Sequence, residues 1–181
     1  MAKVLTLSTT FPSYHINKGK PTYFVEKLIS ALDKIGLIDA YSVLDNNVPF
    51  DVIYYLDCES KNHTIRKGKR WKVGDWFSPR IWGNDINPKS GRRGPYHSKQ
   101  IIIAPDIQVK QVYDFKINNN GSIFIDGKHF GYYGDICKND GLSPANFRSW
   151  FKISEDDSGT TPLFDGQIIC WVGKDIVNYT N

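Results

Sequence analysis

The clearest hydrophobic pattern in the chain predicts a helix close to the N-terminus. Its apolar positions recur at i, i+4, i+8 and i+11, which places them on one helical face: Phe24, Leu28, Leu32 and Ile35. Pro21 or Thr22 is suited to begin this helix, and Gly36 is suited to end it. Ahead of it, the apolar residues among the threonines of residues 3–9 predict a first strand. The apolar run of residues 48–57 fits either a strand or the edge of a helix.

From residue 61 onward, short apolar runs separated by turn residues predict a series of strands. They cover residues 76–82, 101–104, 107–117, 122–125 and 167–172. Residues 119–121, with the sequence Asn-Asn-Gly, are expected to form a hairpin turn. Residues 84–98 form a long loop rich in Gly, Pro and basic residues, of a length that is usually functional or mobile. A second helix is expected over residues 143–151, with Ser143 as its N-cap and Pro144 at its first position.

These elements predict an α+β, mostly β fold: a small antiparallel β-barrel with two flanking helices. The 181 residues are 40% apolar, which supplies one sizeable core, so residues 1–181 are expected to form a single domain. Within it, residues 1–57 would form the N-terminal strand, helix and extension, and residues 58–181 the barrel core. Nowhere do about 18 apolar residues run together as a membrane span requires. We therefore expect a soluble, cytoplasmic protein that does not bind membranes.

The cysteines and histidines argue against disulfides, metals and cofactors. The three cysteines are an odd number without a C-x-x-C pair, which favours reduced, structural thiols: Cys58, Cys137 and Cys170. The histidines expected in loops lack the spacing of metal ligands: His15, His97 and His129. The sequence has no phosphate-binding loop, dinucleotide fingerprint or hydrolase serine motif, so no metal and no cofactor is predicted.

Positive charge is concentrated in one segment of the chain. The net charge is +4, but residues 61–100 hold eleven Lys or Arg against two acidic residues. Aromatic residues lie among these cations, an arrangement on which unpaired bases stack: Trp71, Trp76, Phe77, Trp82 and Tyr96. The pattern predicts RNA or single-stranded nucleic acid as a partner, with these candidate contacts: Lys67, Arg70, Trp71, Arg80, Arg92 and Arg93. The alternative is that the aromatics are core positions of strands and the cations form a solvated face.

The stretch Lys61-Asn62-His63-Thr64-Ile65-Arg66 holds the residues best suited to chemistry. In a strand, Thr64 and Arg66 share one face, so Lys61 joins them only if the chain turns near Asn62. Thr64 is then a candidate nucleophile, and Lys61 is its candidate base if burial or neighbouring cations lower the pKa of the amine. Arg66 stays protonated and would donate to an oxyanion or a phosphate. The alternative is an anion-binding pocket without turnover.

Four features occur in the order found in ASCH domains, which belong to the PUA-like superfamily of small β-barrels. They are Lys61-x-x-Thr64-x-Arg66, the turn of residues 72–75, the segment Asp140-Gly141-Leu142-Ser143 before a helix, and the closing strand after Gly166-Gln167. The chain also resembles a longer ASCH-like group, common in bacteria of the Bacteroides kind and their phages. That similarity lies in an N-terminal segment: Thr10-Phe11-Pro12, His15, Gly19 and Pro21-Thr22-x-Phe24. Together the similarities cover nearly the whole chain.

One branch of the ASCH family consists of small amidohydrolases that remove the acetyl group from N(4)-acetylcytidine and similar acylated cytosines. By this resemblance, Lys61, Thr64 and Asp140 would be catalytic, Arg66 would bind the substrate, and His15 would lie at the rim of the pocket. Asp140 stands where these enzymes have a glutamate, so its carboxylate would fall short unless the backbone moves. The dipole of the helix that follows Asp140 would favour the ionised carboxylate, which would hold Lys61.

Three functions follow from these features. The leading hypothesis is an ASCH-like domain that binds RNA, single-stranded nucleic acid or a modified nucleobase through the K-x-x-T-x-R pocket. The second is an amidohydrolase that acts on acylated cytidine with the same residues. The third is a protein-interaction module that uses the aromatic segment as a contact surface and leaves Lys61 exposed to solvent.

Overall fold

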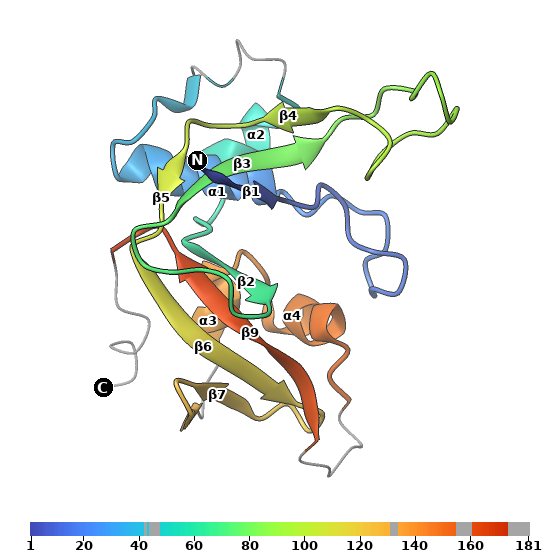
Figure 1. Cartoon of the computed structure of the whole chain (residues 1–181). Helices are drawn as coiled ribbons and strands as arrows, with labels where there is room; N and C mark the ends of the chain where they lie inside the picture. Colours follow the sequence, from blue (N-terminus) through green and yellow to red (C-terminus); the bar gives the residue numbers. More distant parts are fainter. Residues whose placement is uncertain (42, 44–47, 131–133, 155–160, 174–181) are drawn as a thin grey trace.

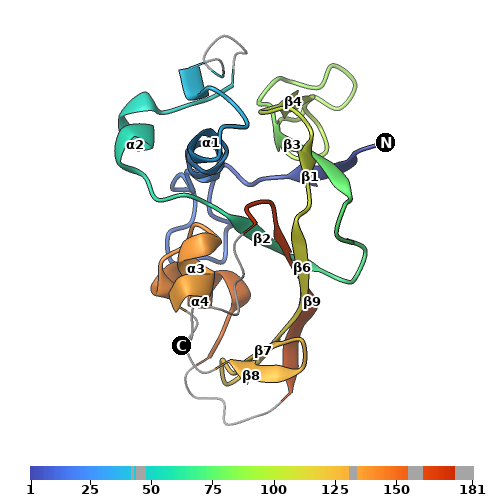
Figure 2. The same cartoon turned by 90° about the vertical axis from the view of Figure 1, so that its left-hand side faces the viewer.

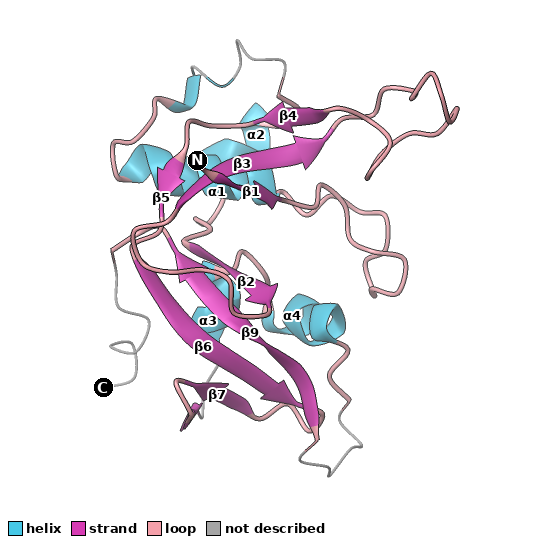
Figure 3. Cartoon of the chain, in the orientation of Figure 1, coloured by secondary structure: helices cyan, strands magenta, loops and turns pink. Residues whose placement is uncertain are grey.

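The computed structural model describes residues 1–41, 43, 48–130, 134–154 and 161–173, and these form two β-sheets and four α-helices. Figures 1 and 3 show the two sheets one above the other, with β1, β3, β4 and β5 in the upper layer. In the view of Figure 2, the helices lie on one side and the sheets on the other. The protein thus has a helical layer that faces both sheets.

The upper sheet is built around β3 (Trp76–Trp82). β1 (Lys3–Thr6) pairs with β3 in parallel, and β4 (Gln100–Ile102) and β5 (Ile107–Gln108) pair with it antiparallel. The helix α1 (Phe24–Lys34) lies beside this sheet and buries Leu28, Ile29 and Leu32 completely. Full burial of such a side chain stabilises the fold by roughly 2 kcal/mol, so these three contribute several kcal/mol. An apolar spacing of about 3.6 residues in the sequence is what a helix with one buried face requires.

The lower sheet has the strand order β2-β9-β6-β7-β8 and is antiparallel throughout. Its strands are β2 (His63–Lys67), β6 (Gln111–Asn118), β7 (Ile123–Ile125), β8 (Lys128–Phe130) and β9 (Pro162–Cys170). Apolar side chains on alternate positions of β6 are buried, among them Phe115 and Ile117, whereas in β9 consecutive residues from Gly166 to Cys170 are buried. β2 lies at the edge of this sheet, so the residues that precede it in the chain can contact the helical layer.

Three shorter helices complete the helical layer. They are α2 (Val52–Asp57), α3 (Gly134–Asn139) and α4 (Pro144–Phe151). Ser143 caps α4, since its hydroxyl accepts a hydrogen bond from the N–H of Asn146, and Pro144 occupies the first turn. Asp51 caps α2 in the same way by accepting from the N–H of Tyr54.

The α+β, mostly β fold class is confirmed, but the closed barrel is wrong because the two sheets stay open. The physical reason lies in residues 107–117, which were expected to form one strand. Ile107–Gln108 pair with β3 of the upper sheet, whereas Gln111–Asn118 pair with β9 of the lower sheet. The chain therefore crosses between sheets at residues 109–110. Two flanking helices were expected, and the described part of the chain has four, of which α3 was not expected.

Within the described residues, no helix is long and apolar enough to cross a membrane.

Candidate functional site

Lys61 lies just ahead of β2 and is almost completely buried, with 1% of its surface exposed. Backbone hydrogen bonds hold this position: the N–H of Lys61 donates to the carbonyl of Lys27 on α1, and its carbonyl accepts from Nε1 of Trp171. The N–H of Asn62 donates to the carbonyl of Asn139 at the end of α3. These contacts place residues 61 and 62 outside the strand. The rule that successive side chains of a strand point to opposite faces therefore does not apply to Lys61.

Asp140 meets Lys61 from the end of α3. Its Oδ1 atom lies 2.6 Å from Nζ of Lys61, and the same amine donates to the backbone carbonyl of Asp140. The expected shortfall of the shorter carboxylate does not occur, because the helix end places the backbone of Asp140 directly beside the amine.

Gly141 explains how α3 delivers Asp140. It has a φ of +79°, and the N–H groups of Gly141 and Leu142 donate to the carbonyls of Lys138 and Cys137, which is the Schellman ending of a helix. A Cβ atom at Gly141 would lie 3.2 Å from Cδ of Lys27 and 3.5 Å from Cβ of Lys61. Glycine is thus required here both by the left-handed backbone and by the close approach of these two lysines.

A small, partly enclosed cavity, which we call the Lys61 cavity, brings together four of the residues singled out from the sequence: Lys61, Thr64, Arg66 and Asp140. Its remaining walls are mainly apolar: Leu7, Ser8, Phe24, Ile65, Trp150 and Phe151. Its volume is about 30 Å³. That is room for about two water molecules and far below the roughly 300 Å³ of a typical small-molecule site.

The guanidinium of Arg66 has a hydrogen-bond donor without a partner in the described part of the chain. Its Nη2 atom donates to the carbonyl of Thr6 over 2.7 Å, but its buried Nε atom has no hydrogen-bond partner among the described residues. An unpaired buried donor costs about 1–3 kcal/mol, so a ligand oxygen that accepted from it would recover that free energy. Thr64, 4% exposed, places a hydroxyl group in the same lining.

Burial dominates the electrostatics of the Lys61–Asp140 pair. Burial lowers the pKa of Lys61 to about 8, helped by Arg66 and Lys27 and opposed by Asp140. Burial also raises the pKa of Asp140, against the effect of Lys61 and Arg66. The expectation that a helix dipole favours the ionised Asp140 is therefore outweighed by desolvation. An amine that titrates near pH 8 is suited to accept a proton under physiological conditions.

Two of the sequence candidates are packed in the interior and lie outside the lining of the Lys61 cavity. His15, 3% exposed, stacks on Phe11 at 4.2 Å between ring centroids, and its Nε2 atom lies 2.9 Å from the carbonyl of Asn146 on α4. Trp71, 2% exposed, packs edge-on against Phe77 in the core. His15 thus anchors the N-terminal loop to α4, and Trp71 offers no accessible face for a base.

The basic candidates are spread over the surface. Arg80 on β3 is half-buried and donates to Gln100 and Ser78. Lys67 at the end of β2 and Arg70 are exposed, and the guanidinium of Arg70 lies over the ring of Trp71. Arg92 and Arg93 are exposed on the loop between β3 and β4, which projects from the body of the molecule in Figure 1.

Sequence reasoning missed three residues around the cavity. Phe24 and Trp150 were expected only to bury helix faces, yet their rings lie 5.7 Å apart in its wall, and Nζ of Lys61 lies 4.4 Å from the centre of the Phe24 ring. Lys27 donates to the carbonyl of Gly141 over 2.7 Å, and burial lowers the pKa of its amine. No sequence signal connects these positions, because their proximity depends on how α1 and α4 pack.

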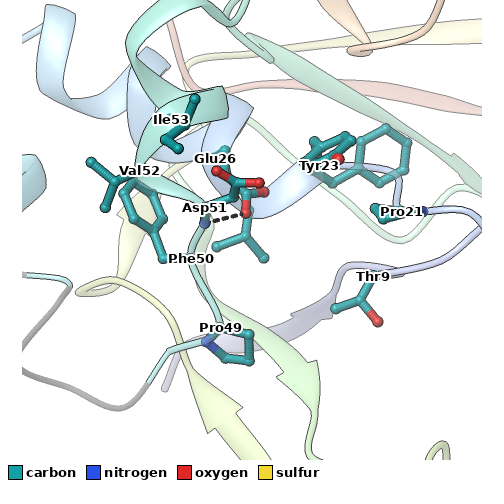
Figure 4. Close-up of a pocket in the computed structure, with 11 residues that line it drawn as sticks. Thr9, Pro21, Tyr23, Glu26, Pro49, Phe50, Asp51, Val52 and Ile53 are labelled. Carbon is teal, nitrogen blue, oxygen red and sulfur yellow. Dashed lines mark hydrogen bonds between the residues drawn. The ribbon is translucent and has the colours of Figure 1, made fainter.

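A separate groove of about 600 Å³ lies where the N-terminus of α1 meets the segment leading into α2. Figure 4 shows the carboxylates of Glu26 and Asp51 between Phe50 and Tyr23, with the N–H of Asp51 donating to Oε1 of Glu26. Its volume is typical of ligand sites, but no cation is among its described lining residues. A phosphate or other anion would be repelled there, so this groove is not a candidate for the predicted nucleic-acid contact.

The chain matches no protein-family model, and no curated protein and no solved structure shows significant similarity to it.

Proposed function

We propose that the protein is an ASCH-like domain that binds a modified nucleobase, and that the Lys61 cavity receives a small substituent of that base. The observation that carries the proposal is the convergence of Lys61, Thr64, Arg66 and Asp140 on one cavity. An amine, a hydroxyl and a guanidinium in one apolar enclosure are donors suited to an amide or acyl oxygen.

The size of the cavity limits what enters it. A space of about 30 Å³ accommodates an acyl group but not a pyrimidine ring. The base itself would remain at the mouth, beside the half-buried side chains of Arg66 and Trp150. Discrimination between a modified and an unmodified base follows, since only the modified base fills the cavity and satisfies the free Nε of Arg66.

Binding is tested by calorimetric titration with N(4)-acetylcytidine and with cytidine. The acetylated nucleoside should bind more tightly, and Arg66→Gln should weaken its binding by about 10-fold or more, because a hydrogen bond to a charged donor is worth about 1.5–3 kcal/mol. The matched control is Arg70→Gln, which removes an exposed guanidinium from the neighbouring segment. Equal binding of the two nucleosides, or an Arg66→Gln protein that binds like the wild type, would refute the proposal.

A second function, hydrolysis of an N(4)-acyl group, is favoured by the pKa of about 8 for Lys61, which lines the same cavity as Thr64. Neutral Lys61 would take the proton of the Thr64 hydroxyl as its oxygen attacks the acyl carbon, while Arg66 donates to the oxyanion. The C–N bond then breaks, the proton passes to the departing amine, and the acyl group remains on Thr64 as an ester. Water would hydrolyse this ester, releasing the carboxylic acid and restoring Thr64.

Chromatography of cytidine released from N(4)-acetylcytidine separates the two functions. If the protein is a hydrolase, its turnover rate should rise with pH and reach a plateau above about pH 8, because the Lys61 amine loses its proton. Thr64→Val should abolish turnover and Thr64→Ser should retain part of it, with both variants checked for folding by circular dichroism. Tight binding of the acetylated nucleoside without turnover in the wild type would exclude hydrolysis and leave binding.

A further inference from the structure

The loop between β3 and β4, residues 83–99, carries a concentration of exposed positive charge; we call it the basic arm. It holds one acidic residue, Asp85, and four exposed cations: Lys89, Arg92, Arg93 and Lys99. None of the four makes a salt bridge or a side-chain hydrogen bond with any residue in the described part of the chain. Four cations without an ion-pair partner in the described ranges are available to an anionic partner.

The basic arm is held in shape by its own hydrogen bonds. The side chain of Asn87 donates to the carbonyl of His97 over 2.8 Å, and the hydroxyl of Ser98 donates to the carbonyl of Asp85 over 2.7 Å. The N–H of Gly94 donates in turn to the Ser98 hydroxyl. These contacts tie the outgoing and returning halves of the arm together, so a partner would meet a largely preorganised surface and would lose less entropy on binding.

Tyr96 gives the arm an exposed aromatic face. Its side chain is 86% exposed, and its backbone has a φ of +65°, an uncommon conformation for a residue other than glycine. The ring lies 5.3 Å from that of Trp82 at the end of β3, at an angle of 49°. An aromatic ring presented to solvent among unpaired cations is the combination that binds single-stranded nucleic acid, through stacking and through phosphate contacts.

Hydrogen bonds connect the base of the arm to the Lys61 cavity. Arg66, which lines the cavity, donates to the carbonyl of Thr6 on β1. The Thr6 hydroxyl lies 3.5 Å from Nε2 of Gln100 on β4, and Oε1 of Gln100 accepts from Arg80 on β3. Hydrogen bonds through Thr6 and Gln100 therefore link Arg66 in the cavity lining to Arg80 and to β4, where the arm ends.

We propose that the basic arm binds the backbone of single-stranded RNA or DNA, with Tyr96 stacking on an unpaired base, so that the natural target of the cavity is a base within a strand. The inference rests on the proposed function for the class of ligand. It adds that the affinity for a strand exceeds that for the free nucleoside, because the strand contacts both regions.

The charge contribution is tested by fluorescence anisotropy with a labelled 12-nucleotide single strand that carries one central N(4)-acetylcytidine, over a series of salt concentrations. The double variant Arg92→Ala/Arg93→Ala should lower the slope of log K against log salt by about 1.4, since each phosphate neutralised on a single strand contributes about 0.7. The control removes two exposed cations away from the arm, one in the connection between the two sheets and one on β8: Lys110→Ala/Lys128→Ala. An arm variant with the wild-type slope, or a control with an equal decrease, would overturn the proposal.

The stacking contribution is tested with Tyr96 variants in the same assay. Tyr96→Ala should weaken binding of the strand about fivefold or more, whereas Tyr96→Phe should keep the wild-type affinity because it retains the aromatic face. Tyr41→Ala is the control, since Tyr41 is also largely exposed, at 64%. Unchanged affinity in Tyr96→Ala, or tighter binding of a duplex of the same sequence than of the single strand, would contradict a stacking role.

Free N(4)-acetylcytidine separates a failure of the arm from a failure of the cavity. If the arm is a strand contact, the arm variants bind the free nucleoside as the wild type does. If wild type and arm variants bind the nucleoside equally and also bind the strand equally, the arm proposal alone fails. If the wild type does not discriminate the acetylated nucleoside but strand binding depends on the arm, the arm stands and the proposed cavity function fails.

Discussion

The Lys61 cavity and the basic arm use positive charge in opposite ways. In the cavity, Lys61 is 1% exposed and paired with Asp140 at 2.6 Å, and burial lowers the pKa of its amine to about 8. On the arm, Lys89, Arg92 and Arg93 are exposed and make no ion pair within the described residues. Desolvation makes the buried charge costly and reactive, whereas water and salt screen the exposed charges. The comparison indicates that the cavity is suited to chemistry or selective recognition, and the arm to attraction of a polyanion.

The largest effect should come from breaking the buried pair. Asp140→Ala leaves the Lys61 amine buried without its carboxylate, which should lower the free energy of unfolding by about 3–5 kcal/mol in urea denaturation. The exposed pair Lys69–Asp114 has the same 2.6 Å separation, so Asp114→Ala is a matched control and should change stability little.

The double variant Lys61→Met/Asp140→Leu sharpens this test. Replacing both charged groups by apolar ones should restore most of the lost stability, because no unpaired charge remains buried. If Asp140→Ala and the exposed control cost the same, the claim that burial distinguishes the two regions is wrong.

Gly141→Ala should have the next largest effect. The alanine combines a left-handed backbone, at a cost of about 1–2 kcal/mol, with a Cβ atom 3.2 Å from Lys27. Gly91 on the arm has a φ of +66°, but no atom lies within 4 Å of the position that a Cβ would take there, so Gly91→Ala carries the strain without the close approach. Urea denaturation should therefore show a larger loss of stability for Gly141→Ala, and equal losses would mean that the packing around Lys61 adjusts freely.

The pH dependence of stability should reveal the depressed pKa of Lys61. Between about pH 8 and the ordinary value of 10.5, the unfolded chain holds a proton on this amine that the folded protein has released. The unfolded state therefore binds more protons, and this group makes the free energy of unfolding rise with pH across that window. Lys61→Met should lack this component when denaturation curves are measured from pH 7.5 to 10.5. If the free energy of unfolding depends on pH in the same way in the two proteins, the pKa of Lys61 is not lowered.

The smallest effect should come from the arm. Arg92→Ala/Arg93→Ala should change the free energy of unfolding by no more than about 0.5 kcal/mol, since neither side chain contacts the protein through an ion pair or hydrogen bond in the described residues. A clearly larger change would mean that the arm's arginines are structural.

Elements with a local signal could be predicted, and elements without one could not. The helix around Leu28 and the helix capped by Ser143 were identified because periodicity and capping are properties of neighbouring residues. The helix α3 was missed because its six residues bury only Ile136 and Cys137, too few for a period to be visible. Gly141 is the sequence signal that marks its end, because a glycine commonly closes a helix through the Schellman motif found here.

The division of the expected strand of residues 107–117 between two sheets also had no local signal. Apolar residues recur at mostly alternate positions of this run, which suits one strand, and only the positions of β3 and β9 separate Ile107–Gln108 from Gln111–Asn118. Strand pairing joins residues distant in sequence, so tertiary context decides where such a run breaks.

The sequence by itself determined the secondary structure of the strongly patterned segments, the excess of positive charge in residues 61–100, and the choice of Lys61, Thr64, Arg66 and Asp140 as residues to examine. Only the tertiary structure decided that these four line one cavity, that this cavity holds about 30 Å³, and that Arg92 and Arg93 lie on a projecting arm while Trp71 is buried. The reason is physical: residue type and spacing set local preferences, whereas burial, and with it the pKa of Lys61, depends on which distant segments pack together.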